Sequence, residues 1–119
     1  AGTSTAYSWG DDINATLANY NVSGLSQTRD VGYYAANSWG FFDMHGNVWE
    51  WTADWYQAAY PTGNPVVNPT GPASGSRRVF RGGPWSRGGP YLRSAKRDHN
   101  TPGGRFYDVG FRVGFQKVQ

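Results

Sequence analysis

The 119-residue sequence contains no cysteine. This excludes disulfide bonds, thiolate metal sites and cysteine nucleophiles from the chain, but it does not indicate a compartment. Charged residues are also scarce, at 16%, and no apolar run approaches the ~18 residues of a membrane-spanning helix. No segment of helical length keeps a clean 3.6-residue period, so we expect helices to be few and short.

Aromatic residues make up 17% of the chain, with 17 glycines and 7 prolines. This composition is typical of a loop-rich globular protein and not of a disordered or fibrous one. The length fits one domain over residues 1–119. We therefore expect short strands, frequent turns and a modest core.

Charge is unevenly distributed. Residues 1–76 carry one basic and six acidic side chains, whereas residues 77–119 carry ten basic and two acidic ones. A pI near 9.4 raises the possibility of nucleic-acid binding. The arginines stand singly among Gly, Ser and aromatic residues and no nucleic-acid motif is present, so we expect the two halves to pair within one fold and no nucleic acid to bind.

The most unusual stretch is 41–56, where aromatic and acidic residues interleave. Burying Trp49, Trp51 and Trp55 would remove roughly 150–250 Å² each from water. Glu50, between two of them, must face solvent, be paired or bind a metal. The plainest interpretation is a core strand with Glu50 on its exposed side.

Alternation and turn residues predict the remaining elements. We expect a helical turn at 41–44 and a loop at 60–76. The expected strands are 31–34, 47–55, 77–81 running into a glycine turn, 91–97, and 109–115 with Val109, Phe111, Val113 and Phe115 on one face.

Candidate catalytic groups are few. His45 and His99 are far apart and lack the context of a nucleophile elbow, so structural or surface roles fit them better than a role as a base. Asp11 and Asp12 are typical of a solvated turn. Without cysteine there is no zinc spacing. Calcium prefers oxygen ligands, which the side chains of Asn47 and Glu50 and the carbonyl of Val48 supply.

Motifs in order along nearly the whole chain resemble the formylglycine-generating-enzyme (sulfatase-modifying-factor) domain. They are Trp9-Gly10-Asp11, Asn37-x-Trp39-Gly40-x-x-Asp43-Met44-x-Gly46-Asn47-Val48-Trp49-Glu50-Trp51-x-x-Asp54-Trp55, Arg81-Gly82-Gly83-x-Trp85, Leu92-Arg93-Ser94-Ala95-x-Arg97, Pro102 and Gly110-Phe111-Arg112-Val113. The resemblance implies an α+β, C-type lectin-like fold with short strands, few helices and much irregular loop. It also implies that the chain corresponds to the C-terminal half, or a minimal version, of the family domain.

The chain departs from the family where the chemistry resides. The family's oxidases use a copper-binding cysteine pair after the Gly-Gly-x-Trp motif, and here residues 86–92 hold none. The resemblance therefore implies a domain that is not an enzyme and requires no cofactor. An oxidase-like domain that lacks its cysteines is the alternative. In the family, the Gly-Asn-Val-Trp-Glu segment contributes to a calcium site, which carries over to Asn47, Val48 and Glu50.

A non-catalytic branch, the variable proteins of diversity-generating retroelements, resembles the chain closely. In that branch, adenine-specific mutagenesis rewrites a segment ending near Gly-Phe-Arg. Asn codons mutated only at adenine yield Ser, Arg, Gly, Pro, Tyr, Asp, His and Phe, among others. Residues of this set fill the gaps between the fixed motifs, though ordinary surface loops favour many of the same residues.

The resemblance thus implies a variable ligand-binding surface over about residues 85–108. Its members are Trp85, Ser86, Arg87, Gly88, Pro90, Tyr91, Asp98, His99, Asn100, Gly104, Phe106, Tyr107 and Asp108. Such aromatic anchors beside small residues are typical of protein-binding surfaces.

The expected partner is a protein or glycan on another surface, which favours display at a cell or particle surface. Oligomeric state is left open. The arginines of the scaffold are expected to pair with Asp43, Glu50 or Asp54. They are Arg81, Arg93, Arg97 and Arg112.

Overall fold

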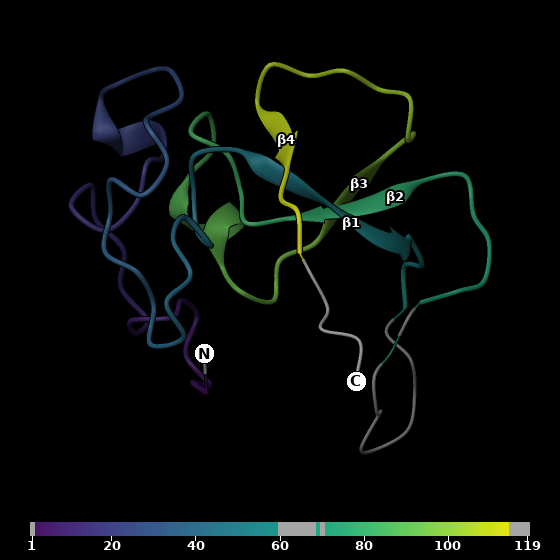
Figure 1. Cartoon of the computed structure of the whole chain (residues 1–119), viewed down its shortest axis with the longest axis horizontal. Helices are drawn as coiled ribbons and strands as arrows, with labels where there is room; N and C mark the ends of the chain where they lie inside the picture. Colours follow the sequence, from purple (N-terminus) through teal and green to yellow (C-terminus); the bar gives the residue numbers. More distant parts are fainter. Residues whose placement is uncertain (1, 60–68, 70, 115–119) are drawn as a thin grey trace.

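The computed structural model describes residues 2–59, 69 and 71–114. Their regular elements are short and lie mostly in the second half (Figure 1). In chain order they are the 3₁₀ helix η1 (Asn21–Ser23), β1 (Trp49–Trp55), β2 (Arg78–Arg81), the 3₁₀ helix η2 (Gly89–Leu92), β3 (Asp98–Asn100) and β4 (Val109–Phe111). Short strands, few helices and extensive loop confirm the expected C-type lectin-like architecture of the formylglycine-generating-enzyme type.

The four strands form one sheet in the order β3-β2-β1-β4. β1 is antiparallel to β2, with Trp51 opposite Phe80, and parallel to β4, with Trp49 opposite Val109. β3 adds antiparallel to β2. The N-terminal third, purple to blue in Figure 1, lies beside the sheet as turns and loops.

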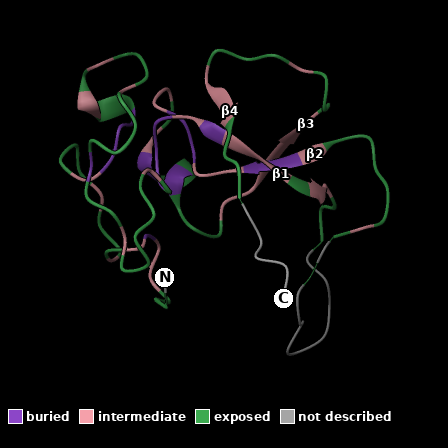
Figure 2. Ribbon diagram, in the orientation of Figure 1, coloured by how far each residue is buried: buried purple, intermediate pink, exposed green. Residues whose placement is uncertain are grey.

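Two groups of buried side chains hold these parts together. In one, Tyr7, Ala18, Tyr20 and Leu92 join the N-terminal segment to η2. In the other, Phe80 packs against Trp49 and Trp51, with ring centroids 5.0 and 5.1 Å apart. Figure 2 shows the buried positions running through β1, β2 and η2, so the core is distributed between sheet and loops.

The strand through the tryptophans confirms the prediction, although only Trp49 is fully buried and Trp51 and Trp55 are half-buried. The Arg78 guanidinium lies 3.5 Å from the Trp55 ring centroid and covers it. A cation over an indole face stabilises such a ring at a partly exposed position.

Three expected elements are wrong. Residues 31–34 form a turn, with Gly32 at a positive φ. Residues 41–44 are not a helical turn, because Asp43 has φ +54°, outside the right-handed helical region. Residues 91–97 are not a strand, because Leu92 ends η2 fully buried against the N-terminal core.

The last strand is shorter than expected and β3 was missed. β4 ends at Phe111, and Phe111 and Val113 are 78% and 68% exposed. Their apolar face is therefore not part of the core of the described chain. Phe115 and most of the expected 60–76 loop lie outside the described residues.

Candidate binding surface

The Gly46-Asn47 pair is joined to two other segments of the chain by backbone hydrogen bonds. Gly46 N donates to Gly82 O at 2.9 Å, and Asn47 N donates to Asn19 O at 2.8 Å. Trp85 N in turn donates to Asn47 O at 2.8 Å. This junction fixes the N-terminal segment and the start of the expected variable stretch against β1.

The Asn47 side chain makes a second set of contacts at the same junction. Its Oδ1 accepts from Arg29 N at 2.8 Å and from Asn19 Nδ2 at 3.3 Å, and its Nδ2 donates to Arg29 O at 3.0 Å. The side-chain amide of Asn47 thereby bonds both the backbone N–H and the backbone C=O of Arg29, as a residue of a neighbouring strand would. Asn47 is 7% exposed, so these bonds are shielded from water.

Beside this junction, Glu50 is bound by Arg112. Arg112 Nε and Nη2 donate to the two Glu50 carboxylate oxygens at 2.8 and 2.6 Å, and Nη1 donates to Phe42 O at 2.8 Å. The bond to Glu50 raises the pKa of Arg112, so the guanidinium is always charged. The expected pairing of Arg112 with Glu50 is confirmed.

The other scaffold arginines bind elsewhere. Arg81 and Arg93 donate to the carbonyl oxygens of Ser94 and Pro90, so the expected pairing with carboxylates is wrong for both. Arg97 donates to the carbonyl oxygens of Gln57 and Ala58. Backbone carbonyls are the partners because short, irregular segments leave many of them outside any sheet ladder.

His45 has a structural role. It is buried, Ser8 N donates to its Nε2 at 3.1 Å, and its Nδ1 lies 2.7 Å from Leu92 O. A carbonyl only accepts, so the proton sits on Nδ1 and the ring is neutral. Burial lowers the pKa of His45, although the Leu92 bond opposes this. His45 therefore ties the N-terminal turn to the end of η2.

The side-chain oxygens of the expected calcium ligands already accept hydrogen bonds in this arrangement. Both Glu50 oxygens accept from Arg112, and the Asn47 oxygen accepts from Arg29 and Asn19. Across the described part of the chain, no three His, Asp or Glu side chains gather as a metal site would require. A calcium ion there has to displace Arg112 from Glu50.

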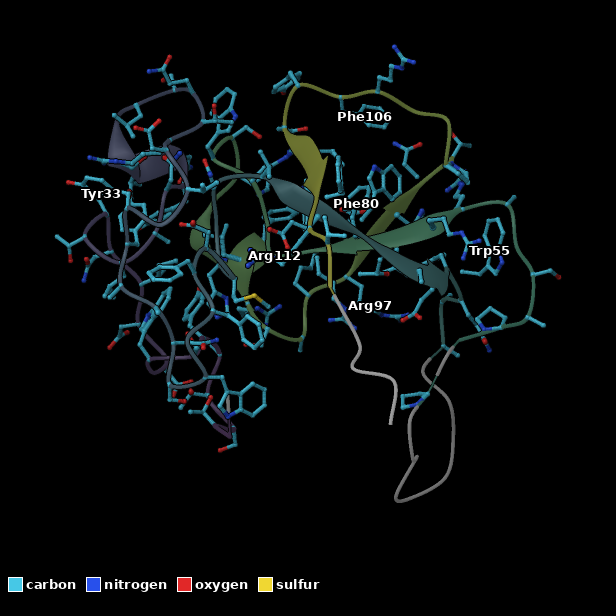
Figure 3. The ribbon with its side chains drawn as sticks, in the orientation of Figure 1. Tyr33, Trp55, Phe80, Arg97, Phe106 and Arg112 are labelled. Atoms are coloured by element: carbon cyan, nitrogen blue, oxygen red, sulfur yellow. The ribbon has the colours of Figure 1, made fainter. Side chains whose placement is uncertain are left out.

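The expected variable positions come together in space. A cavity of about 210 Å³ opens between the sheet and the β3–β4 connection. Six of the thirteen expected positions line it: Arg87, Asp98, His99, Asn100, Phe106 and Asp108. Figure 3 shows Phe106 within the arch of that connection, with Phe80 below it in the view.

The sequence did not identify the residues at the floor of this cavity as part of a binding site. Trp49, Phe80 and Val109, from three neighbouring strands, form it. Tyr56 was also not identified from the sequence as part of this site, although its ring contacts His99 in a tilted arrangement with centroids 3.6 Å apart. Strand alternation marks these residues as inward-facing, but only the sheet order places them under the loop.

Other expected positions surround the cavity or lie apart from it. The Tyr107 ring lies 5.7 Å from the Trp85 ring, and Ser86 Oγ donates to Asp108 Oδ2 at 2.8 Å. Gly104 lies under the Phe106 ring. Gly88, Pro90 and Tyr91 lie at the start of or within η2 and do not line the cavity.

A second hollow, of about 470 Å³, is lined by Glu50 and Arg112. Val31, Phe42 and Phe111 give it apolar walls, and all three are exposed.

Among the helices of the described residues, none has the length and apolarity to cross a bilayer.

Comparisons with known proteins place the chain among sulfatase-modifying-factor proteins. The family model "Sulfatase-modifying factor enzyme 1-like domain" matches residues 1–116. The formylglycine-generating enzyme of Streptomyces coelicolor is 34% identical over 89% of the chain and 39% of its own length.

Two solved structures have the same fold. Treponema denticola variable protein 1 gives a TM-score of 0.82 at 35% identity, over 92% of this chain and 40% of that one. PvdO from Pseudomonas aeruginosa gives 0.71 at 30% identity, over 85% and 40%. The chain thus spans about two fifths of the length of these proteins.

Proposed function

The chain belongs to the sulfatase-modifying factor enzyme 1-like domain family, and we propose that on this scaffold it is a non-catalytic ligand-binding domain with a variable surface over about residues 85–108. The observation that carries the proposal is the convergence of separate expected positions on one cavity with an aromatic floor. The similarity to a variable protein supports it. Its partner is a protein or glycan on another surface.

The division between floor and rim suits this role physically. Trp49 and Phe80 are buried in the sheet, whereas Arg87, Phe106 and Tyr107 are exposed. Substitutions at exposed positions away from special contacts change stability by only about 0.5 kcal/mol. A preformed scaffold also loses little entropy when it binds. The rim can therefore change while the fold remains.

The oxidase alternative is less well supported. The family includes copper-dependent oxidases, and a formylglycine-generating enzyme is among the relatives. Within these 119 residues, however, no cysteine is available to hold copper. Among the described residues that line the proposed cavity there is no Ser, Thr, Cys or Lys, and its histidine contacts Tyr56 and Arg77.

Sequencing the gene and its flanking DNA in many sibling cells tests the proposal. We expect substitutions at Arg87, Asp98 and Phe106, with Trp49 and Phe80 unchanged, and a near-copy of this stretch differing only at adenines. Gly88 and Gly89 give an internal comparison. A Cβ at Gly88 would meet nothing nearer than 3.8 Å, whereas at Gly89 it would lie 2.7 Å from Ile13 Cγ2. Gly88 is therefore expected to vary and Gly89 to stay fixed. One invariant gene without such a copy would refute the variable surface.

Calcium binding by Asn47, Val48 and Glu50 is a separate proposal, and it requires that Arg112 release Glu50. Because Arg112 holds both Glu50 oxygens, calcium should bind Arg112→Gln at least about tenfold more tightly than the wild type. Isothermal titration with CaCl₂ measures both affinities, and Glu50→Gln in the Arg112→Gln background is the control. Absence of calcium binding to both the wild type and Arg112→Gln would refute the proposal.

A further inference from the structure

The size and walls of the cavity indicate what it can hold. At about 210 Å³, it is smaller than the roughly 300–1,000 Å³ of a typical small-molecule site. That volume suits one long side chain of a partner. Phe106 from the loop presents aromatic surface to whatever enters, whereas Trp49 and Phe80 are buried in the sheet beneath it.

Two carboxylates stand at its rim. Asp98 Oδ1 accepts from His99 N at 2.9 Å, and Asp108 Oδ2 accepts from Ser86 Oγ at 2.8 Å. Both donors are neutral, and the described residues provide neither carboxylate with an ion pair. Each aspartate therefore keeps one carboxylate oxygen without a hydrogen bond from the described part of the chain.

Two nearby arginines lie beside aromatic or imidazole rings, and a third, Arg105, is exposed in the β3–β4 connection. The Arg87 guanidinium is exposed and lies 5.6 Å from the Tyr91 ring centroid, on the η2 side. Arg77 Nη1 lies 3.4 Å from His99 Nδ1. The lining residues include two acidic side chains, Asp98 and Asp108, and one basic side chain, Arg87, although the whole chain has a formal net charge of +3.

From these observations we propose that the cavity accepts the ammonium or guanidinium of a lysine or arginine side chain from a protein partner. The alkyl stem packs on the exposed Phe106 ring, which also attracts the cation. Asp98 and Asp108 supply charge-assisted hydrogen bonds at the mouth. The inference rests on the proposed binding function and deepens it. Because both aspartates are expected variable positions, the preference belongs to this chain and its siblings would differ.

The test uses n-butylammonium as the probe, with n-butanol as its neutral counterpart. Heteronuclear NMR follows the Trp49 indole, Phe106 ring and Val109 methyl resonances during titration. We expect saturable shifts confined to the cavity, with a Kd on the order of millimolar for the cation. The neutral alcohol is expected to bind at least about fivefold more weakly.

Variants of the same size separate charge from shape. Asp98→Asn combined with Asp108→Asn keeps an acceptor oxygen for His99 N and Ser86 Oγ. It should weaken n-butylammonium binding at least about fivefold and leave n-butanol binding unchanged. Asp12→Asn, at an exposed position in the N-terminal turns, controls for overall charge and should change neither. Thermal unfolding by circular dichroism checks that each variant is folded.

Equal affinity for cation and alcohol, or equal cation affinity in the wild type and the double variant, would overturn the cation preference. Cavity binding of the alcohol would then still support a binding surface. Absence of cavity shifts with either probe would also overturn the inference. The proposed function would not fall with it, because sequence variation among sibling cells tests that independently.

Discussion

Gly46→Ala is expected to reduce the free energy of unfolding by about 4 kcal/mol. Gly46 has φ +92°, and an added Cβ would lie 2.5 Å from the backbone oxygen of Asn19. That oxygen already accepts from Asn47 N, so it cannot retreat without breaking the junction. Urea unfolding followed by tryptophan fluorescence measures the change.

Gly40→Ala is the matched control for the Gly46 prediction. Gly40 has a similar positive φ of +82°, but a Cβ there would meet nothing within 4 Å. It should cost only about 1–2 kcal/mol, from backbone strain. If the two variants lose the same stability, the contact with Asn19 does not constrain the fold and the explanation is wrong.

Asn47→Ala is expected to reduce the free energy of unfolding by about 3 kcal/mol. It removes hydrogen bonds to the N–H and C=O of Arg29 and to Asn19 at a buried position. Leaving a buried backbone group unsatisfied costs about 1–3 kcal/mol. Asn47 also has φ +69°, a conformation that asparagine adopts more readily than alanine. Denaturant unfolding at neutral pH gives the difference.

Asn37 offers a comparison of the same residue type. Its Oδ1 also accepts two backbone N–H bonds, from Trp39 at 2.9 Å and Phe41 at 3.1 Å, but in an exposed turn. Water replaces those bonds in Asn37→Ala, so we expect a loss of about 1 kcal/mol or less. A loss at Asn47 no larger than that at Asn37 would contradict the role given to its buried amide.

Both large effects concern the base of the proposed binding surface. Asn47 O accepts from Trp85 N, and Trp85 begins the variable stretch. Trp49, two residues further on, forms part of the cavity floor. The Gly-Asn-Val-Trp-Glu motif therefore joins the N-terminal segment to the scaffold and supports the display surface without being exposed to a ligand itself.

Local sequence patterns predicted the strands that pack on aromatic side chains. β1 and β2 follow from the tryptophans and from Val79-Phe80, because period-2 alternation and burial act on neighbouring residues. In both strands one short stretch contains most of the energy that decides its structure. For Glu50 the sequence predicted only a carboxylate that faces solvent, is paired or binds a metal, with Arg112 as one of four candidate arginine partners.

Predictions failed where distant contacts outweigh local preference. Residues 91–97 alternate like a strand, yet the burial of Leu92 against Tyr7 and Tyr20 draws 89–92 into a 3₁₀ turn. Residues 109–115 alternate as well, but β4 stops at Phe111 and the next residue binds Glu50 and the 42–43 loop. In both cases the contacting residues are distant in the sequence, so the local alternation could not predict where the strand ends or fails to form.

The sequence by itself determined the family, the C-type lectin-like fold, the absence of thiolate chemistry and the segments expected to vary. These depend on residue identity and order, which motifs record directly. Only the tertiary structure decided that Asp98, Phe106 and Asp108 share one cavity over Trp49 and Phe80. It also decided that Arg112 neutralises Glu50 where calcium was expected. The physical reason is that strand order β3-β2-β1-β4 and the loops between the strands set these distances, and pairing across a sheet depends on the whole chain.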